Sequence, residues 1–162
     1  MDQHENPKEC QIQKQLILVI ATPALEIMQQ DGWDGGERLE SLNRALALLE
    51  AALAAHGADP GNEVIGMAVI KAYEFSFELS WKTLKDLLAY GGIDALLPRE
   101  VLRQAFAYGL VQDGQLWIDM LEQRNLMAHT YDVSRAQQAL AMIRERFAPA
   151  LLSLAVDLEQ RR

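Results

Sequence analysis

The chain contains 162 residues, half of them apolar, and carries a formal net charge of −8 at neutral pH. This length suits one domain with a substantial hydrophobic core. The acidic balance disfavours general affinity for nucleic acid, which needs basic surface to neutralise phosphates. The single cysteine, Cys10, excludes an internal disulfide framework and fits a reducing compartment.

The N-terminal segment is not expected to be a secretory signal peptide. Asp2 and Glu5 make its start acidic, whereas a secretory signal peptide begins with basic residues. The longest apolar run, residues 16–25, has about half of the residues that a membrane-spanning helix needs, and it contains Pro23. We therefore expect a cytoplasmic protein without membrane insertion.

The first 36 residues are predicted to form an N-terminal extension of uncertain structure. Residues 16–20 are rich in β-branched side chains and are compatible with either a strand or a short buried helix. Glycines at residues 32, 35 and 36 then interrupt the chain. We accordingly divide the chain into this extension, residues 1–36, and a helical domain, residues 37–162.

Two long helices are predicted at the start of the helical domain. In the first helix, leucines at spacings of three and four residues define one apolar face (Leu39, Leu42, Leu46, Leu49, Leu53). Gly57 suits the C′ position at the end of this helix. A turn at residues 58–62 leads to a second helix that runs to about Tyr90, where Gly91 and Gly92 end it.

An apolar, partly aromatic stripe follows one face of this second helix (Ile70, Tyr73, Phe77, Trp81, Leu84, Leu88). Such a stripe can stack nucleobases, but its helical spacing favours a core, and we interpret it as core.

Three further helices complete the predicted fold. Pro98 suits the first turn of a short helix that ends near Tyr108, and Asp113 is predicted to cap the next helix. The last helix begins after Asp132, and Pro149 is expected to kink or restart it. The sequence thus predicts an all-α fold, an antiparallel up-down bundle of four main helices plus one short helix.

Residues 124–131, Arg-Asn-Leu-Met-Ala-His-Thr-Tyr, contain the side chains best suited to chemistry. Arg124 offers a fixed positive fork for phosphate, and His129 can exchange a proton near neutral pH. On a helix, residues seven apart lie within about 20° of each other, whereas residues five apart lie roughly 140° apart. Tyr131 can therefore share a face with Arg124, while His129 turns away unless the helix ends or a second chain faces it.

A structural interpretation of the same residues stays open. A His in the last turn of a helix often only satisfies terminal carbonyls and the helix dipole, and an Arg followed by Asn is common on helix surfaces. The net negative charge lies mainly in residues 1–63, and residues 64–162 are nearly balanced rather than basic, so any RNA contact must be local. Candidate cations for such a contact are Arg124, Arg103, Lys82 and Arg135.

Other catalytic arrangements are absent from the sequence. It contains no Gly-rich phosphate loop, no closely spaced His/Cys ligand set and no Gly-x-Ser-x-Gly elbow, so we expect neither a metal nor a cofactor. Glu74 and Glu78 are one helical turn apart and offer a carboxylate pair. We interpret them as an exposed face, with Glu78 and Lys82 forming a favourable i,i+4 pair.

Four ordered segments resemble the HEPN-type nucleotidyltransferase substrate-binding family. They are residues 73–85 (YEFSFELSWKTLK), 98–106 (PREVLRQAF), 113–122 (DGQLWIDMLE) and 124–131 (RNLMAHTY). The last segment is similar to the Arg-x4-His-x-Tyr signature of HepT-type toxins. The resemblance covers roughly residues 37–158 and implies a homodimer that associates with a separate minimal nucleotidyltransferase.

The resemblance also implies roles for individual residues. In HepT-type members, the Arg and His of two chains meet across the dimer and cleave RNA without a metal. Carried over, His129 acts on the ribose 2′-hydroxyl or the leaving oxygen, Arg124 stabilises the charge on the phosphate, and Asn125 positions Arg124. Tyr131 matches the tyrosine that the nucleotidyltransferase antitoxin adenylylates to silence the toxin. The alternative is a non-catalytic, substrate-binding subunit of a two-component nucleotidyltransferase.

Overall fold

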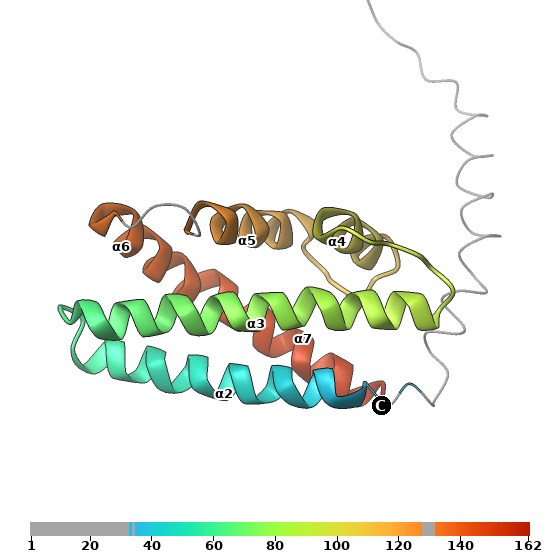
Figure 1. Cartoon of the computed structure of the whole chain (residues 1–162), viewed down its shortest axis with the longest axis horizontal. Coiled ribbons are helices and arrows are strands. Elements are labelled where there is room, and N and C mark those ends of the chain that lie inside the picture. Colours follow the sequence, from blue (N-terminus) through green and yellow to red (C-terminus); the bar gives the residue numbers. More distant parts are fainter. Residues whose placement is uncertain (1–32, 34, 128–131) are drawn as a thin grey trace, which may run out of the picture.

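The structure is a computed structural model that describes residue 33, residues 35–127 and residues 132–162. Within these residues all regular elements are helices, namely α2 (Gly36–Ala58), α3 (Glu63–Tyr90), α4 (Pro98–Ala107), α5 (Gly114–Met127), α6 (Val133–Met142), the π-helical segment η1 (Ile143–Phe147) and α7 (Ala148–Gln160). The long helices α2, α3 and α5 and the final run from α6 to α7 alternate in direction, with short α4 at one end (Figure 1). The predicted antiparallel bundle with one short helix is confirmed.

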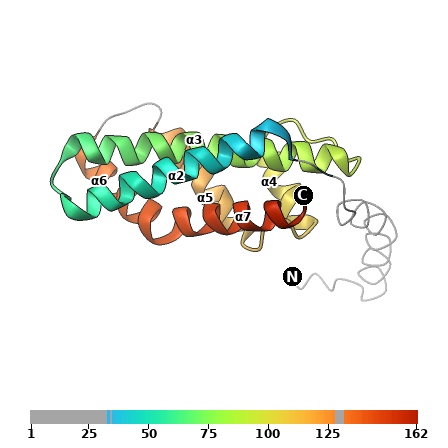
Figure 2. The same ribbon diagram turned by 90° about the horizontal axis from the view of Figure 1, so that it is seen from below.

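Helix α3 is the central element of the bundle. It contacts α2, α4, α5, α6 and α7, and α2 in turn packs beside α7 (Figure 2). Tyr73, Phe77 and Trp81 are buried, and the Tyr73 ring stacks on Phe147 with their centroids 5.5 Å apart. The predicted core role of the aromatic stripe is thus confirmed. Each such side chain stabilises the fold by roughly 1.5–3 kcal/mol when fully buried.

Three hydroxyl groups also lie in the buried face of α3. Ser76, Ser80 and Thr83 each donate a hydrogen bond to the backbone carbonyl four residues earlier, over 2.8, 2.7 and 2.6 Å. These bonds satisfy the hydroxyls within their own helix. Small polar residues therefore fit between the aromatic side chains without an unpaired buried donor.

Side-chain caps fix the starts of three helices. The Asn62 Oδ1 atom accepts hydrogen bonds from the backbone amides of Val64 and Ile65 at the start of α3. The carboxylates of Asp113 and Asp132 accept from backbone amides in the first turns of α5 and α6. The capping role predicted for Asp113 is confirmed. Such caps typically contribute about 1 kcal/mol each.

Gly57 does not have the role that its position in the sequence predicted. Helix α2 continues to Ala58, and Gly57 is not among the glycines with positive φ. It is an ordinary helical residue in the last turn rather than a C′ glycine. By contrast Gly92, which follows α3, has a φ of 81°, a conformation that favours glycine.

The final helical run changes its hydrogen-bond pattern just before Pro149. Ala148 donates its backbone N–H to the Ile143 carbonyl, five residues back, and residues 143–147 form a π-helical turn. Pro149 lacks an N–H group, and its ring would collide with a carbonyl in a regular turn, so a wider turn accommodates it. The predicted interruption thus takes the form of η1, and α7 resumes directly after it.

Polar contacts close the end of the bundle where α2 begins. Arg38 of α2 pairs with Asp86 of α3 over 2.6 Å, and Asn43 donates to Glu159 of α7 over 2.7 Å. Trp33 is buried beside this end. The division of the chain at residue 36 stays a prediction, because residues 1–32 and 34 lie outside the described part. No helix in the part of the chain that the structure describes has the length and apolar character to cross a membrane.

Candidate functional site

Arg124 lies in the last turn of α5 and reaches across to α3. Its Nη2 atom donates to Glu78 Oε2 over 2.8 Å, which forms an ion pair between the two helices. The two side chains are 33% and 28% exposed, so the pair is partly shielded from water while remaining accessible. Helix α5 therefore presents the arginine at the surface in an orientation that α3 restrains.

Glu78 is itself held by two neighbours on α3. Its Oε2 atom also accepts a hydrogen bond from the Trp81 indole over 3.0 Å, and its Oε1 atom pairs with Lys82 Nζ over 3.0 Å. Burial alone would raise the pKa of Glu78. The hydrogen bonds from Trp81 and Lys82 and the charges of Arg124 and Lys82 outweigh burial and lower that pKa below its usual value. Glu78 is therefore a carboxylate at neutral pH.

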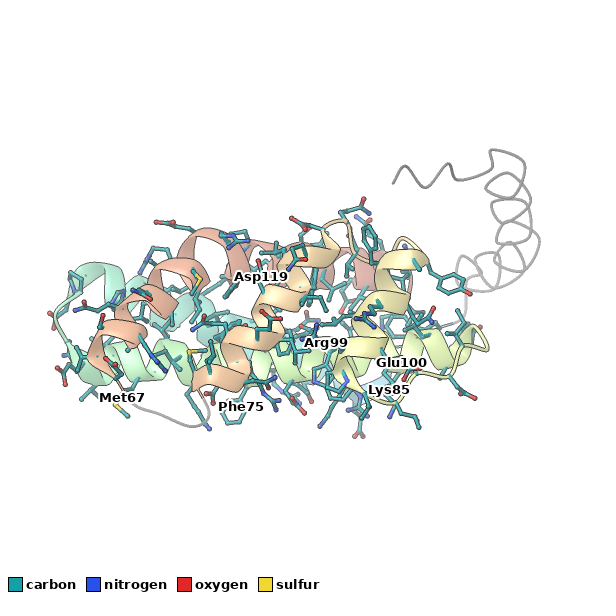
Figure 3. All side chains as sticks on the ribbon, turned by 90° about the horizontal axis from the view of Figure 1, so that it is seen from above. Met67, Phe75, Lys85, Arg99, Glu100 and Asp119 are labelled. Carbon is teal, nitrogen blue, oxygen red and sulfur yellow. The ribbon has the colours of Figure 1, made fainter. Side chains whose placement is uncertain are left out.

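An open groove of about 1030 Å³ runs along α3 beside this pair. Polar side chains line one part of it, including Lys71, Glu74, Glu78, Arg124 and Asn125, and apolar side chains line the rest (Val64, Met67, Ala68, Ile70, Phe75, Met127). The labelled Met67 and Phe75 project from the same side of α3 (Figure 3). Charged and apolar surfaces thus lie next to each other along one helix.

Asn125 follows Arg124 on the rim of this groove. It is exposed, and its Oδ1 atom accepts from Arg124 Nη1 at 3.5 Å, which is a long contact. Glu78 rather than Asn125 makes the short contact to the guanidinium. The positioning role predicted for Asn125 stays a prediction.

The other two predicted site residues lie outside the described residues. His129 and Tyr131 belong to the segment 128–131, which separates the end of α5 at Met127 from the Asp132 cap of α6. The structure therefore places Arg124 and Asn125 only. The arrangement of His129 and Tyr131 around them stays a prediction.

The remaining candidate RNA contacts, Lys82, Arg103 and Arg135, do not all gather around Arg124. Lys82 joins the Arg124 network through Glu78, but Arg103 is exposed on α4. Arg135 lines a separate cavity of about 330 Å³ between α5 and α6. Within residues 33, 35–127 and 132–162, no group of three His, Cys, Asp or Glu side chains is arranged to hold a metal ion.

The exposed face predicted for Glu74 and Glu78 is wrong. Both are partly buried rather than fully exposed, and Glu78 binds Arg124 as well as Lys82. The predicted Glu78–Lys82 pair is confirmed, and Glu74 pairs instead with Lys71 over 3.3 Å. Spacing within one helix revealed the Lys82 contact, whereas the Arg124 contact joins residues 46 positions apart and has no local signal.

Comparison with known proteins identifies the family. The sequence model of the family described as "Nucleotidyltransferase substrate binding protein like" matches residues 37–160, which include α3, α5 and the Arg124 segment. The chain belongs to this family. The match begins at residue 37, so the first 36 residues lie outside it.

A curated relative and two solved structures are similar to this chain. A Haemophilus influenzae protein named probable ribonuclease HepT is 34% identical over 79 residues, which cover 46% of this chain and 54% of that protein. The match thus spans about half the length of that relative. A Haemophilus influenzae structure, described as having the fold of a substrate-binding domain of a nucleotidyltransferase, aligns with a TM-score of 0.65 at 27% identity. A crystal structure of a Thermus thermophilus protein aligns with the same score and identity, and both alignments cover 75% of this chain and 98% of the other.

Proposed function

We propose that this protein is a HepT-like endoribonuclease toxin that acts without a metal and is controlled by a cognate minimal nucleotidyltransferase, its antitoxin. The observation that carries the proposal is Arg124, which Glu78 holds on the wall of an open groove. Arg124 also begins the Arg-x4-His-x-Tyr segment in the sequence. A restrained, accessible guanidinium suits a phosphate group, since it offers several N–H donors in a planar fork.

The proposed reaction is attack by a ribose 2′-oxygen on the neighbouring phosphorus. A bond forms between the 2′-oxygen and phosphorus, and the bond from phosphorus to the 5′-oxygen breaks. The 2′-hydroxyl loses its proton to a base, and the departing 5′-oxygen takes up a proton. His129 serves one of these two proton transfers, and Arg124 stabilises the negative charge that grows on the phosphate. The products are a 2′,3′-cyclic phosphate and a 5′-hydroxyl end.

We place this site at the interface of a homodimer. As the resemblance to HepT-type members implies, the His129 that serves each Arg124 is proposed to come from the second chain. An exposed apolar stripe on α3 leads along the groove to Arg124, and Val64, Met67 and Phe75 are 76%, 53% and 54% exposed along it. Large exposed apolar side chains in a row commonly mark a protein contact. The second copy is proposed to cover this stripe.

Regulation by the partner enzyme is proposed to act on Tyr131. The tyrosine oxygen would bond to the α-phosphorus of ATP, its proton would be lost, and pyrophosphate would leave. The resulting AMP group adds bulk and negative charge seven residues from Arg124. It would repel an RNA phosphate from the site. Membership of a family associated with nucleotidyltransferases supports this choice of partner.

The test of the proposed function is cleavage of mixed cellular RNA by the purified protein in excess EDTA. Wild type is expected to cleave and to leave 2′,3′-cyclic phosphate ends. His129→Ala and Arg124→Ala are each expected to abolish cleavage with helicity unchanged. If wild-type protein with unmodified Tyr131, verified by mass spectrometry, leaves the RNA intact, the nuclease proposal is wrong.

The second candidate function is a non-catalytic subunit that binds the substrate of a nucleotidyltransferase. Two observations favour it: the net charge of −8, and the ion pair that Arg124 already forms with Glu78. This alternative predicts no cleavage by wild type. It also predicts that adding the protein lowers the KM of the partner nucleotidyltransferase for its acceptor.

A further inference from the structure

The carboxylate of Glu78 connects Arg124 to the hydrophobic core. Trp81 is only 8% exposed, and its indole N–H donates to the same Glu78 oxygen that accepts from Arg124. The second oxygen of Glu78 pairs with Lys82. A side chain with a partner on each oxygen has few alternative orientations. The position of the Arg124 guanidinium is thus set by a chain of contacts that starts at a core indole.

The contact geometry leaves the arginine able to bind a second anion. Glu78 meets Arg124 through a single short contact, from Nη2 to Oε2, rather than through two parallel bonds. A guanidinium has five N–H donors, so one contact orients the group while using a small part of its donor capacity. Two cations, Arg124 and Lys82, surround the one carboxylate. The cluster therefore stays attractive to phosphate.

We propose that Glu78 is a positioning residue for RNA cleavage, which acts through Arg124 and does not itself touch the RNA. If the guanidinium is already held in place before the RNA binds, it loses less conformational entropy when it stabilises the transition state at phosphorus. The inference rests on the proposed nuclease function. It adds to the site a residue of α3, outside the Arg-x4-His-x-Tyr segment, that determines the cleavage rate.

The alternative role for the same contact is inhibition. If Glu78 competed with phosphate for Arg124, removing its charge would speed cleavage. If it positions Arg124, removing it slows cleavage. The two roles therefore predict opposite changes in kcat.

The experiment measures cleavage of a defined RNA by the full-length protein in EDTA. Glu78→Ala is expected to lower kcat by about tenfold or more with KM changed less than about threefold, because a transition-state contact is weakened. Glu78→Gln keeps an oxygen acceptor of the same shape and is expected to fall between Glu78→Ala and wild type. It also reports on positioning if Glu78→Ala does not fold.

The matched control is Glu122→Ala. Glu122 lies on α5, two residues before Arg124, and pairs with Arg99 of α4 over 3.2 Å. It is thus a Glu–Arg contact between helices outside the groove, and its loss is expected to leave kcat and KM at wild-type values. Exposed pairs of this kind contribute little to stability, so the variant is expected to fold normally.

A second measurement separates positioning from a general structural role. Arg124→Lys keeps the charge but loses the planar fork, and it is expected to retain weak cleavage. If Glu78 acts through that fork, adding Glu78→Ala to Arg124→Lys costs little more activity, so the two effects are not additive. Full additivity, or wild-type or faster cleavage by a folded Glu78→Ala, overturns the inference while the nuclease function stands. Absence of cleavage by unmodified wild type overturns both.

Discussion

At the residue scale, the polar groups next to the site are held by partners from the buried part of the bundle. Tyr73 lies one turn before Phe77 on α3, and its hydroxyl donates to the Met120 carbonyl of α5 over 2.7 Å. Burial raises the pKa of the Tyr73 phenol well above its usual value, while the charge of Arg124 opposes this. This hydrogen bond fixes α5 against α3 one turn before Arg124.

We predict that Tyr73→Phe lowers the free energy of unfolding by about 1–2 kcal/mol near neutral pH, because the bond to Met120 is lost. Wild-type stability should then fall above about pH 10, since the unfolded tyrosine loses its proton there and the folded one does not. The Phe variant lacks this term, so its deficit should shrink at alkaline pH. Urea unfolding of wild type and Tyr73→Phe, near neutral pH and again above about pH 10, measures how this deficit changes. Tyr90→Phe, at a half-exposed tyrosine, is the control, and a deficit that grows with pH would contradict the prediction.

At the element scale, the sequence predicted the helices well because their determinants are local. The leucine spacing of α2, the caps at Asp113 and Asp132 and the glycines after α3 all act within a few residues. The contact between Glu78 and Arg124 depends on how α3 and α5 pack, and no spacing rule encodes it.

Because α2 continues past Gly57, this glycine is a helical residue whose replacement can be predicted. Gly57→Ala should raise the free energy of unfolding by about 0.5 kcal/mol, because alanine loses less backbone entropy in a helix. A Cβ atom there would lie 3.8 Å from the Arg144 guanidinium, an ordinary contact. Gly92→Ala is the matched comparison and should lower stability by about 1 kcal/mol or more, since its φ is 81°. Denaturant unfolding of both variants checks this, and a destabilised Gly57→Ala would return Gly57 to a capping role.

At the scale of the whole molecule, charge and apolar surface are distributed unevenly. Residues 1–63 hold eleven acidic and four basic side chains, whereas residues 64–162 hold twelve and eleven. The part of the chain that contains α3 and α5 is therefore nearly neutral. An exposed apolar stripe in a part of the chain without excess positive charge suits contact with a second copy better than general binding to nucleic acid. Under the proposed nuclease function, RNA contact would then be confined to the site itself.

The proposed interface is tested by Phe75→Asp. A charge at the centre of a buried apolar contact should weaken the dimer by at least about 100-fold, and light scattering during gel filtration measures the change. Leu97→Asp is the matched control, because Leu97 is 68% exposed at the start of α4, outside the groove. A dimer that survives Phe75→Asp but dissociates with Leu97→Asp would move the interface to the other end of the bundle.

A composite site built from two chains makes one further prediction. Arg124→Ala and His129→Ala homodimers should each be inactive, since every site lacks one of the two groups. When the two variants are unfolded and refolded together in equal amounts, half of the dimers should contain one chain of each kind. In a symmetric dimer each of these has one site with both groups and one with neither, so the mixture should regain about a quarter of wild-type cleavage. Refolding each variant alone is the control. If the mixture stays as inactive as its parents while wild type refolds to full activity, Arg124 and His129 work within one chain, and the proposal of a composite site is wrong.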